Sequence, residues 1–191
     1  MGFNVFSPEA CARFIDGWRR GHHVSEQRLR RRTPVRYKQV RDVGAELSKR
    51  IGVELDLASA FLEKANFDNH DLLLVDRVPL AMQLENQSDE MGWYPTLRGV
   101  LAWQPGSGWA AVDHGAIPFL MNGADCMGAG IQIADPGVKQ GDLICIRDES
   151  HGKPLAMGWA LVSGEEMVAM SKGKAVKTIH WVGDDLWEVE T

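Results

Sequence analysis

The chain has 191 residues, of which 45% are hydrophobic and 25% are charged, a composition typical of a globular protein rather than a disordered or fibrous one. Its length allows one large domain or two small ones, and no run reaches the roughly 18 consecutive apolar residues of a membrane span. The three cysteines lie too far apart to indicate a disulfide framework or a metal site. Charged residues interrupt the N-terminal segment, so we predict no secretory signal, no membrane partner and a cytoplasmic protein.

The net charge of −5 is unevenly distributed along the chain. Between Arg13 and Arg50 there are 12 Lys or Arg and four Asp or Glu, a local balance of +8, which leaves −13 for the other residues. Such a basic segment is either a solvated helix face or a surface that binds phosphates or an acidic partner.

In chain order, residues 1–27 are predicted to form a separate helical extension, whose helix starts at Ser7 and Pro8. A second helix is predicted after Thr33 and Pro34, because apolar residues then recur at intervals of three and four positions. These apolar residues are Val40, Val43, Leu47 and Ile51.

The pattern changes after a shorter helix that is predicted over Asp56–Glu63. Short apolar stretches separated by turn residues then indicate a small antiparallel meander. These stretches are Ala65–Phe67, Leu72–Val75 and Leu80–Leu84. Pro95–Trp103 is predicted to be a helix that opens at its proline, and residues 28–104 are together predicted to be one α/β domain.

Gln104–Gly108 is the best candidate for a linker, because it combines proline, serine and glycine. The many short strands and glycine turns after it are typical of a small barrel or sandwich over residues 105–191. The predicted strands are Trp109–Val112, Ile131–Ala134, Leu143–Arg147, Leu155–Val162, Val176–Val182 and Leu186–Val189, and the predicted helices are Ala116–Met121 and Glu165–Ser171. The predicted fold class of the whole chain is therefore α+β.

Several motifs of this second domain resemble the PUA domain, which is named for pseudouridine synthases and archaeosine transglycosylases. Val112–Ala116, Asn122–Asp125 and Gly128–Ile131 show the order of strand, glycine, short helix, Gly-Ala-Asp and glycine turn. Val138–Leu143 is similar to the turn before the family's third strand, and Ser171–Val176 is similar to its closing segment. The resemblance covers about residues 108–190 and implies an RNA-binding β-pseudobarrel. Ala129 departs from the family, which usually has proline there, and this loosens the φ restraint of the turn.

A second resemblance lies just before the linker. Trp93–Arg98 resembles the Tyr-Pro-Thr-Leu-Arg signature of the malignant T-cell-amplified sequence and ligatin-like family, and Asp184–Trp187 is similar to that family's ending. Members of this family pair a pre-PUA domain with a PUA domain. The resemblance implies binding to tRNA or rRNA at the small ribosomal subunit during initiation or recycling. It also implies a partner like the density-regulated protein.

The predicted RNA contacts combine glycine backbone with cationic side chains. Glycines let backbone N–H groups approach phosphates closely, a helix N-terminus favours anions, and arginine forks bind phosphate with two hydrogen bonds. The predicted RNA-binding residues are Gly115, Ala116, Gly128, Gly130, Ile131, Lys172, Gly173, Lys174, Arg30, Arg31 and Arg32. The alternative is that the glycines only form turns and that the lysines are solvated. Tyr94, Pro95 and Arg98 are predicted to hold the two domains together.

The sequence shows no catalytic constellation. The Gly-x-Gly patterns at 106–108 and 128–130 lack the rest of a nucleotide-binding motif. Cys126 and Cys145 are predicted to be core thiols rather than nucleophiles. We therefore predict no enzyme activity, no cofactor and no metal. Two alternatives stay open: an accessory factor in ribosome biogenesis or RNA modification without its own catalytic site, and a pure protein adaptor.

Overall fold

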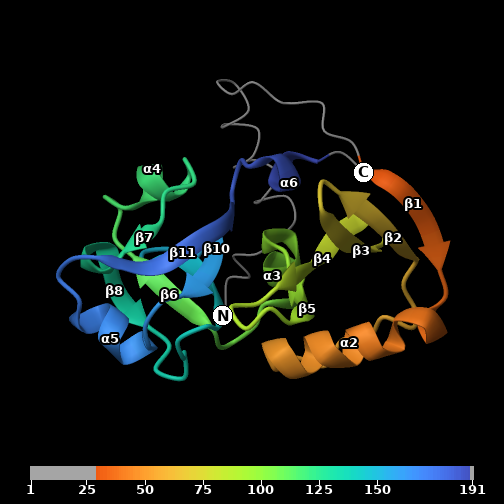
Figure 1. Ribbon diagram of the computed structural model, residues 1–191, viewed down its shortest axis with the longest axis horizontal. Coiled ribbons are helices and arrows are strands. Elements are labelled where there is room, and N and C mark those ends of the chain that lie inside the picture. Colours follow the sequence, from red (N-terminus) through yellow and green to blue (C-terminus); the bar gives the residue numbers. More distant parts are fainter. Residues whose placement is uncertain (1–28, 190–191) are drawn as a thin grey trace, which may run out of the picture.

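The computed structural model describes residues 29–189, so the extension predicted over residues 1–27 lies outside the described residues. Two β-sheets lie side by side along the long axis of the molecule, each with its own helices (Figure 1). The fold is α+β, as the sequence predicts. The first half contains β1 (Arg30–Val35), α2 (Tyr37–Ile51), β2 (Leu62–Phe67), β3 (His70–Val75), β4 (Val78–Glu85), β5 (Met91–Pro95) and α3 (Leu97–Trp103). The second half contains β6 (Trp109–Val112), α4 (Ile117–Leu120), β7 (Cys126–Met127), the 3-10 turn η1 (Gly128–Gly130), β8 (Ile131–Ala134), β9 (Leu143–Asp148), β10 (Pro154–Ala160), α5 (Gly164–Ala169), β11 (Lys174–Trp181) and α6 (Asp185–Glu188).

The first sheet is a five-stranded antiparallel meander in the order β1-β2-β3-β4-β5. Its strands β2, β3 and β4 confirm the predicted meander. Helix α2 packs on one face, where Val40 and Leu47 of the predicted apolar stripe join a core with Leu73 and Trp93 of the sheet. The helix ends at Gly52, whose φ of 69° is the left-handed conformation that glycine adopts without strain.

One predicted helix start and one predicted helix in this half are wrong. Thr33 and Pro34 belong to strand β1 rather than to a helix start, and proline is tolerated there because β1 is an edge strand with one unpaired side. The helix predicted over Asp56–Glu63 does not form. The side chain of Asp56 instead accepts hydrogen bonds from Ala58 N at 3.1 Å and from Ser59 Oγ at 3.1 Å. Such local side-chain bonds compete with helix formation.

The second sheet has the order β7-β11-β10-β9-β6-β8, in which β6 and β9 are parallel and the other neighbours are antiparallel. Its core includes Val112, Ile144, Ile146 and Val176, all fully buried. One predicted strand of this half, Leu186–Val189, is wrong, because Asp185–Glu188 forms helix α6. Asp184 caps that helix, since its carboxylate accepts a hydrogen bond from Trp187 N at 2.7 Å.

The two halves share packed side chains. Leu186 and Val189, which follow the second sheet, lie in one core cluster with Phe67, Leu72 and other residues of the first sheet. The rings of Tyr94 and Trp159 meet edge to face with their centroids 5.2 Å apart. The Arg98 guanidinium donates hydrogen bonds to the carbonyl oxygens of Trp187 and Val189. None of the described helices has the length and apolar character that a membrane span requires.

Replacing Gly99 of helix α3 by alanine is expected to lower the free energy of unfolding by about 3 kcal/mol. An added Cβ would lie 2.0 Å from the carbonyl oxygen of Leu80 and 3.2 Å from Pro95 Cβ, so the helix would have to move away from strand β4. Urea denaturation measures this loss. Gly106→Ala is the matched control, since nothing lies within 4 Å of its added Cβ, and it should change the free energy by less than about 0.5 kcal/mol. Equal effects of the two variants would contradict the argument.

Candidate functional site

The first side of the candidate site is formed where helix α4 meets the turn η1. The amide of Ala116 donates a 3.0 Å hydrogen bond to the carboxylate of Asp113, and Asp113 N donates one of 3.0 Å to Gly130 O. An added Cβ at Gly130 would lie 3.1 Å from Ala116 Cβ, so the backbone of Gly130 packs closely against the side chain of Ala116. The structure therefore places Gly115 and Ala116 next to the glycine turn.

The second side is formed by the segment that leads into β11. Gly128 N donates a 2.9 Å hydrogen bond to Gly173 O, and Met127 of β7 is paired with Lys174 of β11. These contacts bring eight of the predicted residues into one region, here called the glycine-framed surface. It consists of Gly115, Ala116, Gly128, Gly130, Ile131, Lys172, Gly173 and Lys174.

Packing and backbone geometry account for several of these residues. An added Cβ at Gly128 would lie 2.4 Å from Met170 Cβ, and Gly173 has a φ of 92°. Glycine is therefore required at both positions for the fold itself. Ile131 has a buried side chain, so only its backbone can meet a ligand. The amide of Ala116 is already bonded to Asp113. That these residues also bind RNA is a prediction from the sequence.

The charged members of the glycine-framed surface are Lys172 and Lys174, and two acidic residues, Asp113 and Asp125, bond its segments. Lys174 Nζ lies 2.6 Å from Asp125 Oδ2, and this hydrogen bond holds the pKa of Asp125 below its usual value. Lys172 is exposed and has no ion pair among residues 29–189, and Lys177 is also exposed on β11. Lys177 is not among the RNA-binding residues predicted from the sequence, where the alternative for this lysine, as for Lys172 and Lys174, is a solvated side chain.

The predicted arginine group lies elsewhere. Arg30, Arg31 and Arg32 are in strand β1, at the opposite end of the molecule from α4 and β7 (Figure 1). Arg30 and Arg31 are exposed. Arg32 instead pairs with the buried carboxylate of Glu63 through two hydrogen bonds of 2.7 Å. Of the three predicted phosphate ligands, Arg32 thus already has an anionic partner within the chain.

The Arg32–Glu63 pair predicts a specific dependence of stability on pH. The hydrogen bond from Arg32 lowers the pKa of Glu63 in the folded protein. The pair therefore stabilises the fold fully above the pKa of Glu63 in the unfolded chain, which is about 4.3. This stabilisation is lost as the pH falls through the lower pKa that Glu63 has in the folded protein. Glu63→Gln should lower the free energy of unfolding by about 1–2 kcal/mol at pH 7. The loss is no larger because Arg32 is partly exposed, so that water screens the ion pair. Urea titrations from pH 7 down to about pH 3 should show this difference shrinking. A difference that stays constant over that range would contradict the role of the ion pair.

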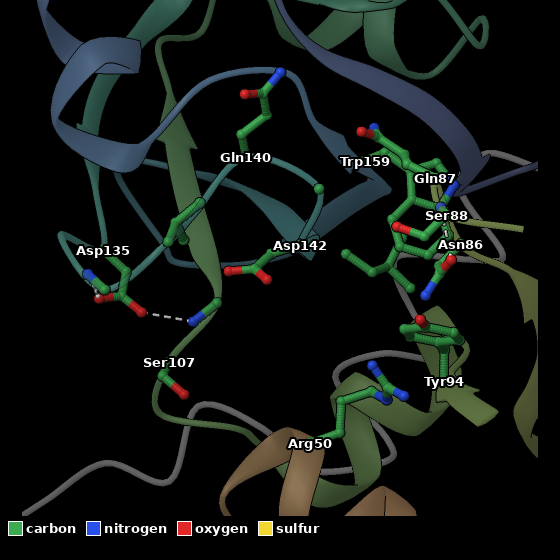
Figure 2. A pocket seen from close by; sticks show the side chains of 15 residues that line it. Arg50, Asn86, Gln87, Ser88, Tyr94, Ser107, Asp135, Gln140, Asp142 and Trp159 are labelled. Carbon is green, nitrogen blue, oxygen red and sulfur yellow. Dashed lines mark hydrogen bonds between the residues drawn. The ribbon is translucent and has the colours of Figure 1, made fainter. Parts of the chain in front are cut away.

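A cavity of about 490 Å³ lies between the two halves (Figure 2). Its charged residues already have partners within the chain. Arg50 stacks 4.0 Å above the ring of Tyr94 and bonds Glu46 at 2.9 Å, while Asp135 accepts hydrogen bonds from the amides of Gly108 and Gly137. Since Arg50 is the only cation among the lining residues, the cavity is less suited to a phosphate chain than the glycine-framed surface.

The two described cysteines are not suited to nucleophilic chemistry. Both thiols are buried, and burial raises the pKa of Cys126 and of Cys145 to about 12. The prediction that they are core thiols is confirmed. Within residues 29–189, no group of three or more His, Cys, Asp or Glu side chains is arranged to hold a metal ion.

The structure also exposes two apolar residues that sequence analysis missed. The side chain of Phe119 in α4 is 67% exposed and that of Met127 in β7 is 47% exposed. Helix α4 has only four residues, which is too short for a hydrophobic period to show which side faces solvent.

Comparisons with known proteins agree with this description. The model of the PUA domain family matches residues 108–182. An uncharacterised protein of Methanocaldococcus jannaschii is 41% identical over 126 residues, which cover 66% of this chain and 75% of that protein. Translation machinery-associated protein 20 of Eremothecium gossypii is 34% identical over 99 residues, which cover 49% of this chain and 55% of that protein.

Malignant T-cell-amplified sequence 1 of Rattus norvegicus is 31% identical over 104 residues, which cover 52% of this chain and 56% of that protein. The matches thus span about half the length of the two eukaryotic relatives. Among solved structures, a hypothetical protein of Pyrococcus horikoshii matches with a TM-score of 0.67 at 34% identity, over 82% of this chain and 98% of that chain.

Proposed function

This chain belongs to the PUA-domain family of malignant T-cell-amplified sequence and ligatin-like proteins, and on that premise we propose that it is an RNA-binding protein of translation. The glycine-framed surface carries the proposal. There, Lys172 and Lys174 lie beside exposed backbone of the second sheet, and among the described residues no backbone hydrogen bond joins that backbone to the chain's first half.

Such a surface binds RNA mainly through its phosphates. Contacts from lysine side chains and backbone amides give affinity and register but do not read sequence. A protein of this kind recognises the shape of a folded RNA, as in tRNA or rRNA. We propose that Arg30 and Arg31, at the far end of the molecule, add a second contact to the same large RNA.

A two-ended contact requires that the halves keep a fixed distance. We propose that Tyr94, Pro95 and Arg98 serve this purpose, in domains that divide at the segment 104–108. The contacts of Tyr94 with Trp159, and of Arg98 with the segment after Asp184, support the role of these two residues. Pro95 is buried and paired with Ala81 of β4, within its own half.

In finer terms, we propose that the RNA belongs to the small ribosomal subunit or to tRNA bound there, during initiation or recycling in the cytoplasm. A protein like the density-regulated protein is the proposed partner of the first half. The name of the Eremothecium gossypii relative, translation machinery-associated protein 20, supports a place in translation.

Co-sedimentation of the full chain with purified small ribosomal subunits, and separately with tRNA, tests this function. We expect binding at low salt that weakens steeply as salt rises, because phosphate contacts release counterions. A protein that binds neither subunits nor tRNA at low salt would contradict the proposal. Tight binding to a protein partner without any RNA binding would instead favour the adaptor alternative.

A further inference from the structure

The cavity between the two halves has charged groups of opposite sign on two of its sides. Figure 2 shows Arg50 and Tyr94 on one side of the open space and Asp135 and Asp142 on the other. Arg50 lies at the end of α2 and Tyr94 in β5, whereas both aspartates lie in the segment between β8 and β9. With a volume of about 490 Å³, the cavity is large enough to hold a small molecule.

The aspartate side of the cavity offers oxygen acceptors that are fixed by the backbone. Asp142 Oδ2 accepts a 2.8 Å hydrogen bond from Lys139 N, and within residues 29–189 no hydrogen bond uses its other carboxylate oxygen. The two oxygens of Asp135 accept hydrogen bonds from Gly108 N at 2.6 Å and from Gly137 N at 2.9 Å. Since a carboxylate can accept about four hydrogen bonds, both groups keep acceptor positions for a cationic ligand.

The opposite side offers one guanidinium that is held in place. Arg50 stacks 4.0 Å above the ring of Tyr94 and donates a 2.9 Å hydrogen bond to Glu46. The ring of Tyr94 is buried and meets Trp159 edge to face, so it forms a firm base under Arg50. Arginine has about five N–H donors, and the stacked guanidinium therefore keeps donors for a ligand carboxylate.

The two sides are close enough for one small molecule to reach both. Burial is the main cause of the raised pKa of Tyr94, and the negative charge of Asp142 adds to this rise, so the carboxylate acts on the ring across the cavity. Beside Asp142, an added Cβ at Gly141 would lie 3.8 Å from Gln87 Oε1, so the turn between β4 and β5 approaches the second half here. A ligand that reaches from Asp142 to Arg50 therefore bridges the two halves.

We propose that this cavity binds a free basic amino acid, whose side-chain cation contacts Asp135 and Asp142 and whose carboxylate contacts Arg50. Two carboxylates and one guanidinium give the lining a formal charge of −1, which the single positive net charge of free arginine or lysine balances. A nucleotide fits less well, because the two carboxylates repel its phosphate. A bare metal ion also fits less well, since residues 29–189 contain no group of three or more His, Cys, Asp or Glu arranged to hold one. The ligand is therefore separate from the RNA of the proposed function.

Isothermal titration calorimetry of the full chain with three matched ligands tests this site. L-arginine should bind saturably, and L-citrulline, in which a neutral urea group of similar shape replaces the guanidinium, should bind about tenfold more weakly. Asp142→Asn should weaken the binding of L-arginine by about tenfold and that of L-citrulline by less than about twofold. Arg50→Gln should weaken the binding of L-arginine by about tenfold, but not that of L-argininamide, which lacks the carboxylate.

Two further variants control for charge and for folding. Asp42→Asn should change none of these affinities, because its side chain is 96% exposed on α2 and lies outside the cavity. Arg50→Lys keeps the positive charge and should retain more affinity for L-arginine than Arg50→Gln does, while thermal unfolding without ligand checks that each variant is folded.

The outcomes distinguish the two ends of the site. Equal affinities for L-arginine and L-citrulline, or equal weakening of both by Asp142→Asn, overturn the cation site. Equal weakening of L-arginine and L-argininamide by Arg50→Gln overturns the carboxylate contact. Absence of saturable L-arginine binding to the unsubstituted protein overturns the whole inference and leaves the proposed RNA binding untouched.

Discussion

Replacing Lys172, Lys174 and Lys177 together by glutamate is expected to weaken RNA binding by about a hundredfold at low salt. Each lysine that contacts a phosphate contributes about 0.7 to the slope of log affinity against log salt for a single strand, and reversal of the charge adds repulsion. The variant should therefore bind weakly and show a shallower salt dependence. Fluorescence anisotropy over a series of salt concentrations measures both quantities.

The fold should survive this triple substitution, because all three side chains are exposed. Lys174→Glu removes the ion pair with Asp125, and a solvated pair of this kind contributes little to stability. The matched control replaces Lys38, Lys49 and Lys139 by glutamate, which changes the net charge equally at exposed sites outside the glycine-framed surface. Equal losses of affinity in the two variants would mean that only total charge matters, and that the surface has no special role.

Trp187→Ala is expected to lower the free energy of unfolding by about 4 kcal/mol and the midpoint of thermal unfolding by about 10 °C. Trp187 is 5% exposed and lies in a cluster with Leu97 and Val100 of α3 and with Cys145 and Met157 of the second sheet. Alanine would leave a cavity at the point where the two halves meet. Thermal unfolding followed by circular dichroism measures the loss, and Met91→Ala, an exposed site on β5, is the control.

The shape of the unfolding curve adds a second measurement. Because the cluster around Trp187 and the one around Leu186 and Val189 both combine residues of the two halves, we expect a single cooperative transition that moves to lower temperature as a whole. Two separate transitions, with only the later half of the chain destabilised, would show that the halves are independent units. That result would also weaken the proposal that they present two RNA contacts at a fixed distance.

Much of the secondary structure follows from local patterns. Strands β6 and β8 have the bounds that the sequence predicts, Trp109–Val112 and Ile131–Ala134, because glycines and polar residues flank short apolar runs there. The stripe from Val40 to Ile51 predicts helix α2, since its period depends only on residues three and four positions apart. The family resemblance depends on such local motifs too, and therefore needs no knowledge of contacts.

The errors fall on short segments whose conformation depends on distant partners. Leu186–Val189 has a composition that suits a strand, but Asp184 caps it as a helix and its apolar residues pack against the first sheet. The segment from Asp56 turns instead of forming a helix, and Phe61 N bonds the side chain of Asp76 on the neighbouring hairpin. Local propensity is too weak in four to eight residues to outweigh such contacts.

The sequence by itself determined the α+β class and the family, and it predicted which residues meet RNA. Only the tertiary structure decided which of those residues share a surface. It packs Gly130 against Ala116 and bonds Gly128 to Gly173. It also pairs Arg32 with Glu63 and leaves the side chain of Phe119 exposed. The physical reason is one of range. Periodicity and turn residues act over a few positions along the chain, whereas burial and charge pairing depend on which distant segments pack together.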